Sequence, residues 1–373
     1  MINRRSFIKT GITAGMALWT GTIAAGCSGL KRSDLKAFPT DMQKQVDLSD
    51  KARTILYHAS LAPSGHNTQP WRVRIESPLT WVIEADADRR LPIVDPDNRE
   101  LMLSLGAFVE NLVVSAAVLG YHVETKVLAR DTFTQDILRI RLHESTALSY
   151  PVQRMKLRRT VKHGQLPKEL DAGDVRALSA NLDDSLVYFP KGSQHAECIA
   201  EAAIENFRIQ SQRDAAQQEL VNWLRLDDAD ARLYRDGLTA EGMEITGFKG
   251  WIMRKFFQAD AFMKPSFRQQ GIDTMAELAH QGGGWFIISS PGQTVADLIE
   301  TGRRFERLAL LAREHRIAIH PMTQILEEAQ GQSLFAKHHD PDFFPQFILR
   351  VGYLDKYPRP VSLRRPVDWF VYA

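Results

Sequence analysis

Residues 58–73 read HASLAPSGHNTQPWRV, and this stretch decides how the rest of the chain is interpreted. An apolar helix is expected to end at Leu61, because the Pro-Ser-Gly sequence that follows breaks helices. Polar side chains then crowd into residues 66–69, and a Pro-Trp pair leads into an apolar strand. Such a junction aims amides, hydroxyls and backbone N–H groups at one place on a fixed scaffold. A flat heteroaromatic ring with carbonyl and imide edges requires that arrangement.

Hydrophobic patterning on both sides of this junction predicts helices interspersed with short strands. Helices are expected at 47–61, with Ser49 or Asp50 as the cap, and at 99–119, 171–181, 194–224 and 294–314. Strands are expected at 71–75, 80–85, 137–142, 285–289 and 347–353.

Two of these helices resemble each other. GAFVENLVVSAAVLGYHVE begins at Gly106 and GRRFERLALLAREHRIAIHP begins at Gly302, an offset of 302 − 106 = 196 residues. The strands ILRIRL at 137 and FILRVG at 347 also match. Two similar halves in this order indicate a tandem duplication, although two amphipathic helices followed by strands could give the same pattern by chance.

A basic segment, RRTVK, opens the second half at residues 158–162. In an extended segment Arg158, Thr160 and Lys162 face the same side. Two cations and a hydroxyl on one side can clamp a phosphate through charge-assisted hydrogen bonds. The alternative is a solvated basic surface, because Arg154 and Lys156 lie close by in the sequence.

Together these segments resemble the nitroreductase family. Residues 63–71 match its flavin-contacting pattern P-S-x-x-N-x-Q-P-W, and residues 158–162 are similar to its phosphate-binding R-x-S-x-K segment. ADADRRLPIVDPDNRELMLSLGAFVENL, at 85–112, resembles the Acg-like branch of the family. The resemblance covers most of residues 50–367. It implies an α+β, nitroreductase-like fold with mainly antiparallel sheets flanked by long helices, whose two similar halves form a fused pseudo-dimer.

The resemblance also implies FMN as the cofactor. One set of flavin ligands is divided between the halves, so one FMN per chain is expected. Asn67 would bond the ring edge or the ribityl chain, Ser64 the ribityl chain, and Gln69 with the amides of Gly65 and His66 would stabilise charge at N1 and O2. The phosphate would be bound by Arg158, Thr160, Lys162, Arg364 and Arg365. His66 could instead cap local backbone, and Arg364 and Arg365 could instead form surface salt bridges. No acid–base residue and no metal ligand is predicted.

The implied activity is that of an FMN-dependent oxidoreductase acting on nitroaromatic, quinone-like or other conjugated small-molecule acceptors. The electron donor would be NAD(P)H or a membrane or periplasmic donor. The alternative is a non-catalytic protein that binds or sequesters flavin in an occluded pocket, with residues Leu226–Lys249 as a lid. The protein would be a pseudo-dimeric monomer or a homodimer.

The N-terminus, MINRRSFIK, resembles a twin-arginine export signal over residues 1–27, and Ile23–Cys27 resembles a lipoprotein processing site. The expected location is the periplasm or the outer face of the cytoplasmic membrane, with membrane contact only through the signal or a lipid anchor. Residues 28–46 are interpreted as a tether, 47–150 as the first half and 151–373 as the second.

The amino-acid composition bears on nucleic-acid partners and on disulfide bonds. The chain has 47 basic and 45 acidic residues and a net charge of +2 with mixed signs, which gives no reason to expect nucleic acid as a partner. Its two cysteines are Cys27 and Cys198, too few for a disulfide framework. Cys198 lies in a helical stretch, AECIAEAAI, and is expected to be buried.

Overall fold

The computed structural model of the chain describes residues 29–37, 46–180, 182, 185–338 and 344–373. The predicted export signal, including Cys27, and part of the predicted tether lie outside the described residues.

The two halves of the chain are built on the same plan. The first contains α2 (Asp50–Ala59), β1 (Trp71–Ser77), β2 (Thr80–Ala85), α3 (Arg99–Val118), β3 (Tyr121–Val127) and β4 (Asp136–Glu144). The second contains α5 (Ala172–Ser179), β5 (Leu186–Pro190), β6 (Gly284–Ser290), α11 (Val295–Ala312), β7 (Ile317–Pro321) and β8 (Phe344–Tyr353). The strand orders are β3-β4-β2-β1 and β7-β8-β6-β5, with antiparallel pairing among these eight strands, so each of them has a counterpart in the other half. The predicted α+β fold with two similar halves is confirmed.

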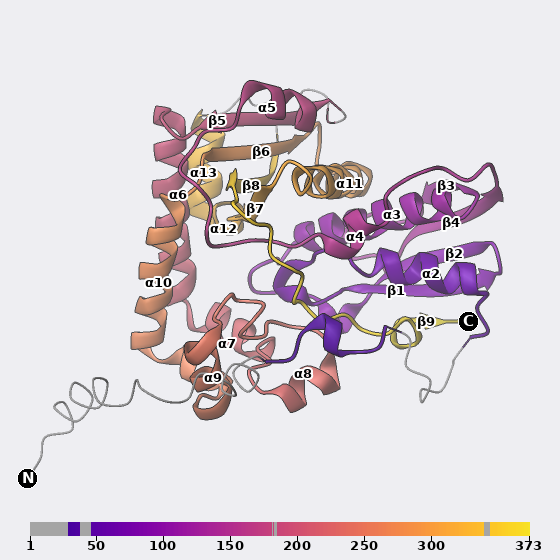
Figure 1. Ribbon diagram of the computed structural model, residues 1–373, viewed down its shortest axis with the longest axis horizontal. Coiled ribbons are helices and arrows are strands. Elements are labelled where there is room, and N and C mark those ends of the chain that lie inside the picture. Colours follow the sequence, from indigo (N-terminus) through magenta and orange to yellow (C-terminus); the bar gives the residue numbers. More distant parts are fainter. Residues whose placement is uncertain (1–28, 38–45, 181, 183–184, 339–343) are drawn as a thin grey trace, which may run out of the picture.

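The halves meet where α3 packs against α11 (Figure 1). A Cβ atom on Gly106 would lie 2.1 Å from the carbonyl oxygen of Ile299, and one on Gly302 would lie 2.0 Å from that of Leu103. Leu103 and Ile299 are separated by the same offset as the two glycines, so the contact is reciprocal, as across the two-fold axis of a dimer. Glycine is required at both positions because the two helix backbones touch there.

The core of the first half encloses α3. Trp71, Trp81 and Phe108 are fully buried in it, and the Ser49 hydroxyl caps α2 by accepting a hydrogen bond from the Ala52 N–H (3.2 Å). Within the described residues, α3 is the one helix long and apolar enough to cross a membrane, but 78% of its most apolar window is buried in the protein. This burial identifies α3 as a core helix.

A helical insertion separates β5 from β6 and distinguishes the second half. It contains α6 (Gln194–Gln212), α7 (Asp214–Asn222), α8 (Asp228–Tyr234), α9 (Gly247–Phe256) and α10 (Pro265–Ala279). The single helix expected at 194–224 is wrong, because Arg213 adopts an extended conformation (φ −79°, ψ 115°) between α6 and α7. The expected burial of Cys198 is also wrong: it is exposed, since Ala196, Ile199 and Ala203 form the inward stripe of α6.

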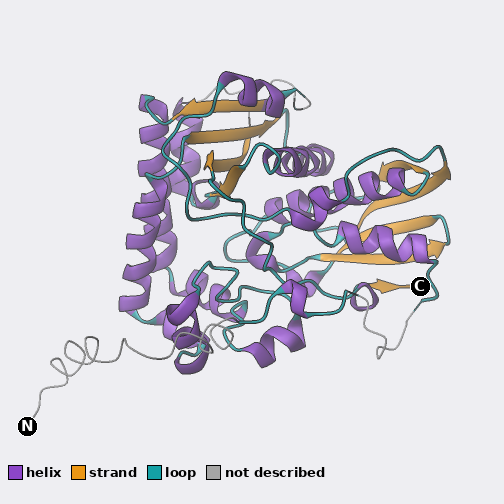
Figure 2. Cartoon of the chain, viewed as in Figure 1, coloured by secondary structure: helices purple, strands orange, loops and turns teal. Residues whose placement is uncertain are grey.

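Both described ends of the chain cross between the halves. After β8 a long loop returns to the first sheet, where β9 (Val371–Tyr372) pairs in parallel with β1 (Figure 2). Near the N-terminus, the Arg32 N–H donates to the Val361 carbonyl in this returning loop (3.2 Å). The predicted motifs are therefore enclosed by segments from both ends of the chain. The remaining helices, α12 (Gln324–Glu327) and α13 (Ala329–His338), lie between β7 and β8.

Candidate functional site

The junction between α2 and β1 has a strained backbone. It forms a short 3-10 turn, η2 (Gly65–Asn67), in which His66 and Asn67 have φ values of 45° and 53°, and Gln69 follows at 55°. The left-handed conformation costs roughly 1–2 kcal/mol for most residues other than glycine, and strained backbone of this kind is concentrated at functional sites. The Ser64 hydroxyl helps to hold the turn by accepting a hydrogen bond from the Gln69 N–H (2.9 Å).

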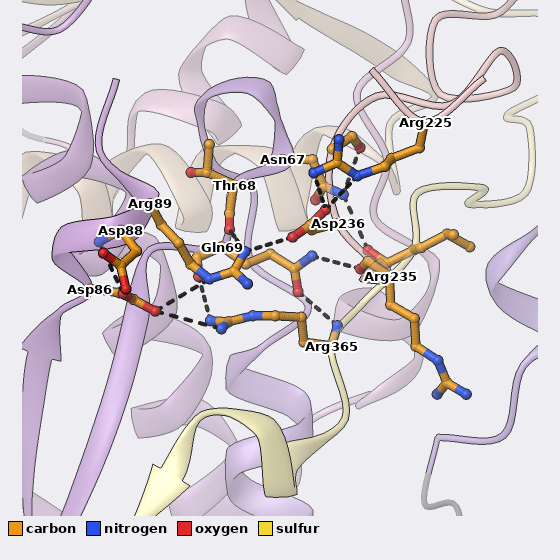
Figure 3. A network of polar contacts seen from close by, with 12 residues as sticks. Asn67, Thr68, Gln69, Asp86, Asp88, Arg89, Arg225, Arg235, Asp236 and Arg365 are labelled. Carbon is orange, nitrogen blue, oxygen red and sulfur yellow. Dashed lines mark hydrogen bonds and ion pairs between the residues drawn. The ribbon is translucent and has the colours of Figure 1, made fainter. Parts of the chain in front are cut away.

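The strained turn aims the side-chain amides of Asn67 and Gln69 at other protein segments (Figure 3). Asn67 donates to the carbonyls of Gly237 (3.1 Å) and Leu363 (3.3 Å) and accepts from Arg364 (2.9 Å). Gln69 donates to the Arg235 carbonyl and accepts from the Arg365 N–H, both at 2.9 Å. In this structure the two amides therefore join the turn to the insertion and to the returning C-terminal loop.

Residues 235–244 of the insertion lie over both predicted motifs. The Gly237 N–H donates to the Asn67 carbonyl (3.1 Å). The Glu244 carboxylate accepts from the backbone N–H groups of Lys162 (3.1 Å) and His163 (2.9 Å). Burial alone would raise the pKa of Glu244, but its hydrogen bonds and the nearby Arg159 guanidinium outweigh burial and lower the pKa to about 2. The segment predicted as a lid, Leu226–Lys249, thus contacts the turn and the basic segment.

Three arginines gather behind the turn, and we call Arg32, Arg158 and Arg364 the arginine cluster. Arg158 Nε lies 3.2 Å from the Glu306 carboxylate, and its Nη2 donates to the Leu61 carbonyl. Arg364 donates to the carbonyls of Leu61 and Ala62, and Arg32 to that of Lys156. Burial, followed by the positive charges of Arg32 and Arg158, lowers the pKa of Arg364 well below its usual value. Burial likewise lowers the pKa of Arg32 to about 10.

The charge in this cluster is incompletely balanced. In the part of the chain that the structure describes, the carboxylate that forms an ion pair with the cluster is Glu306, whose pKa burial raises to about 7 despite the opposing effect of Arg158. Among the described residues, no acceptor is hydrogen-bonded to Arg364 Nε. Three guanidinium groups with one partly protonated carboxyl group form a site suited to a dianion such as a phosphate monoester. The residues therefore fit the phosphate group of FMN.

The counterpart of Glu306 in the first half, at the same offset, is Glu110. Glu110 is bound by Arg303 (3.0 Å) and Arg307 (2.9 Å) of α11. The positions that would correspond to those two arginines around Glu306 are Ala107 and Asn111. The ion-pair partner of Glu306 is therefore Arg158 instead. The two halves therefore differ: Glu110 is held by ion pairs with Arg303 and Arg307, whereas Glu306 lies beside the arginine cluster.

A second set of ionisable side chains lies close to His66, and we call His66, Glu100, Lys162 and Glu327 the His66 group. His66 and Lys162 retain some accessible surface, yet burial lowers the pKa of both, that of His66 to about 4. Burial and the nearby Glu100 raise the pKa of Glu327 well above its usual value. Among the described residues, His66 Nδ1 has no hydrogen-bond partner. Burial therefore disfavours the charged forms of His66, Lys162 and Glu327.

Arg365 lies apart from the arginine cluster. It donates to the carbonyls of Gln69 (2.6 Å) and Trp71 (2.9 Å) and lies 3.7 Å from Asp86 (Figure 3). It lines a separate cavity of about 430 Å³, whose other lining residues are Arg72, Asp86, Asp88, Arg89, Trp223, Arg225, Tyr234, Asp236, Trp369, Phe370, Val371 and Tyr372. Arg364 and Arg365, although adjacent in the returning loop, thus reach different places, the arginine cluster and this cavity.

The predicted site residues are thus divided among four places. Arg158 and Arg364 meet in the arginine cluster, with Asn67 bonded to Arg364. Gly65, His66 and Lys162 lie at the His66 group, with Thr160 half-buried between Arg158 and Lys162 in the chain. Ser64, Asn67 and Gln69 hold the turn, and Arg365 lies at the outer cavity. The described residues contain no group of three His, Cys, Asp or Glu side chains arranged to hold a metal ion.

Sequence reasoning missed four residues in these places: Arg32, Glu100, Glu306 and Glu327. Glu100 could have been found, because it follows the expected helix start at Arg99 and a negative charge in the first turn stabilises a helix. Glu306 could have been found by applying the repeat offset to Glu110. The other two are brought in by tertiary folding alone.

Comparison with known proteins supports the resemblance. No family model matches the chain. Rv3131 of Mycobacterium tuberculosis, a protein assigned by name as an NAD(P)H nitroreductase, is 40% identical over 86 residues, which are 23% of this chain and 25% of that protein. The match therefore spans only a quarter of the length of that relative.

Longer matches are more remote in sequence. PigM of Serratia, also assigned by name as an NAD(P)H nitroreductase, is 24% identical over 79% of this chain and 86% of its own. The similarly assigned acg protein of M. tuberculosis is 24% identical over 86% of this chain and 95% of its own. These matches confirm the predicted resemblance to nitroreductases, including Acg.

Solved structures described as nitroreductases are less similar to this chain. A nitroreductase-type chain from Anabaena variabilis aligns over 90% of this chain and 97% of its own, with 11% identity and a TM-score of 0.36. The FMN-dependent nitroreductase NfnB of Mycobacterium smegmatis, in complex with NADPH, aligns over 56% and 92%, with 14% identity and a TM-score of 0.35. At these scores the alignments add nothing to the sequence relationship.

Proposed function

We propose that this protein is an FMN-dependent oxidoreductase of the nitroreductase type. The observation that carries the proposal is the arginine cluster, which gathers beside the P-S-x-x-N-x-Q-P-W turn an excess of buried positive charge with an unsatisfied donor. Two relatives that match most of the chain are assigned by name as NAD(P)H nitroreductases, which supports the proposed oxidoreductase activity.

In this proposal each part of the site has a separate task. Arg158 and Arg364 bind the phosphate group of FMN, and Lys162, Thr160 and the amides of Gly65 and His66 border its ring and ribityl chain. Asn67, Gln69 and Ser64 position these groups by holding the strained turn. FMN, when bound, supplies the redox chemistry, and the chain supplies orientation, electrostatics and exclusion of water.

The first test is the absorbance spectrum of the purified protein, with flavin quantified after heat release. We expect about one FMN per chain. Arg158→Ala should lose the flavin, whereas the matched control Arg154→Ala, which removes a surface cation paired with Glu314, should keep it. Because Arg158→Ala leaves Glu306 without its partner, Arg158→Lys should be tested beside it, with folding checked by circular dichroism. A wild-type protein that neither carries nor binds FMN would overturn the proposal.

The acceptors that we propose are nitroaromatic, quinone-like or other conjugated small molecules. The donor is NAD(P)H, as the names of the relatives suggest, or a membrane or periplasmic redox partner, as export would favour. We further propose that the chain is exported by the twin-arginine pathway, on the evidence of its N-terminal sequence. Replacing Arg4 and Arg5 by Lys should keep the protein in the cytoplasm, as measured by cell fractionation.

A second candidate function is flavin binding without turnover. It is favoured by residues 235–244, which lie on both motifs, and by Asn67 and Gln69, whose amides serve the protein itself. The two candidates differ in access to the flavin. If photoreduced FMN bound to the protein is reoxidised rapidly by menadione or nitrofurazone, the oxidoreductase is supported. If reoxidation is no faster than flavin release, the sequestering protein is supported.

A further inference from the structure

The described N-terminal segment, residues 29–35, is docked into the fold, and we call it the strap. The Gly29 N–H donates to the Glu241 carboxylate (2.9 Å), and the Leu30 N–H donates to Asp228 (3.1 Å). The Leu30 side chain is 4% exposed and packs against Ala231 and Leu363. Buried apolar contact and backbone hydrogen bonds to distant residues show that the strap belongs to the folded domain.

The docked strap brings Arg32 to the arginine cluster. The Arg32 N–H donates to the Val361 carbonyl, and its guanidinium group donates to the carbonyl of Lys156, two residues before Arg158. Leu30 packs on Leu363, the neighbour of Arg364. The strap therefore runs beside both of the other arginines of the cluster.

A third guanidinium group in this place has an electrostatic cost. Like charges within a desolvated region repel each other more strongly than in water, and within the described part of the chain Glu306 is the one carboxylate paired with the cluster. A bound dianion removes that cost, because each guanidinium group then gains an attractive partner. Docking of the strap and binding of a phosphate group should therefore strengthen each other.

We propose that Arg32 is a third ligand of the phosphate group and that the strap closes the arginine cluster over FMN. This inference rests on the proposed function, because it takes the phosphate of FMN as the anion. Coupling of this kind is reciprocal: the strap raises the affinity for FMN by the factor by which FMN favours docking of the strap.

Affinity measurements on the full chain, freed of flavin, test the ligand role. The probes are FMN, riboflavin, which lacks the phosphate, and inorganic phosphate. We expect Arg32→Ala to weaken FMN binding about 10- to 100-fold, the range for loss of a charge-assisted hydrogen bond, and to leave riboflavin binding unchanged. Lys36→Ala, which removes an exposed cation just beyond the strap, is the matched control and should leave both affinities unchanged.

Trypsin cleavage after Lys36 tests the coupling without any measurement of activity. FMN should slow this cleavage about 10-fold or more in the wild type and have no such effect in Arg32→Ala, while riboflavin should not slow it in either. If phosphate alone protects the strap as well as FMN does, the ligand is an anion in general, and Arg32 keeps its role.

The outcomes separate this inference from the proposed function. If the wild type binds FMN but Arg32→Ala binds it equally well, Arg32 is not a phosphate ligand and the proposed function stands. If the wild type binds no FMN but phosphate protects the strap through Arg32, the proposed function fails and the anion site stands. If neither ligand binds or protects, both are overturned.

Discussion

The strongest energetic consequence of the site concerns Glu306, and Glu306→Gln tests it. This carboxyl group is fully buried beside Arg158, and burial raises its pKa from 4.5 to about 7. Since each tenfold change in proton affinity corresponds to about 1.4 kcal/mol, the raised pKa makes the ionised form cost roughly 3 kcal/mol of folding free energy. Glutamine keeps the size and the polar group but cannot ionise.

The sign of the effect follows from proton binding. Between pH 4.5 and about 7, folded Glu306 keeps a proton that the unfolded chain has already lost. Stability from this group is therefore full below about pH 4.5, falls as the pH rises to about 7, and is constant above it. His66, with its pKa lowered to about 4, acts in the opposite direction between pH 4 and 6.5, so the wild-type curve alone would conceal the effect.

The assay is urea unfolding of flavin-free protein at pH 4.5, 6 and 8, taking the difference between Glu306→Gln and the wild type at each pH. The difference should change by roughly 3 kcal/mol in favour of the variant from pH 4.5 to 8, while His66 cancels in the subtraction. Glu201→Gln, at an exposed position of α6, is the control for the chemical change itself. A difference that does not vary with pH would refute the reasoning.

Two further predictions concern packing. Gly302→Ala places a Cβ atom 2.0 Å from the Leu103 carbonyl oxygen and should lower the free energy of unfolding by about 3 kcal/mol or more. Gly271→Ala in α10 is the control: its Cβ atom would lie 3.8 Å from the nearest atom, and the free energy of unfolding should rise by up to about 1 kcal/mol. Urea unfolding measures both. Gln69→Ala removes the bonds to Arg235 and Arg365 and should cost about 3 kcal/mol, with faster amide hydrogen exchange at Arg365; unchanged exchange there would contradict the holding role.

Much of the fold could be predicted from local pattern. The helix at 99–119 and the strands at 71–75 and 80–85 are confirmed within a few residues, because apolar periodicity and a proline-glycine break determine them locally. The repeat offset between Gly106 and Gly302 predicted a relation between two helices, and the structure places those two glycines in direct contact. Offsets carry tertiary information when a duplicated unit packs against its own copy.

Other features depend on contacts that no local pattern records. The pairing of β9 with β1 joins residues almost 300 positions apart, and two residues are too few to show strand periodicity. Cys198 was misplaced because AECIAEAAI offers apolar residues on more than one face of a helix. The binding roles of the ten predicted site residues stay predictions; the structure shows that Arg158 and Arg364 come together and that Arg365 does not join them.

The returning C-terminal loop has a consequence for the time at which the protein can be completed. Arg364 and β9 lie between residues 364 and 372, yet Arg364 bonds to Asn67 and β9 pairs with β1, almost 300 residues earlier. During synthesis the first half emerges early, and the β1 edge of its sheet stays unpaired until β9 has also left the ribosome. The arginine cluster can therefore be completed only after residues 361–372 have left the ribosome.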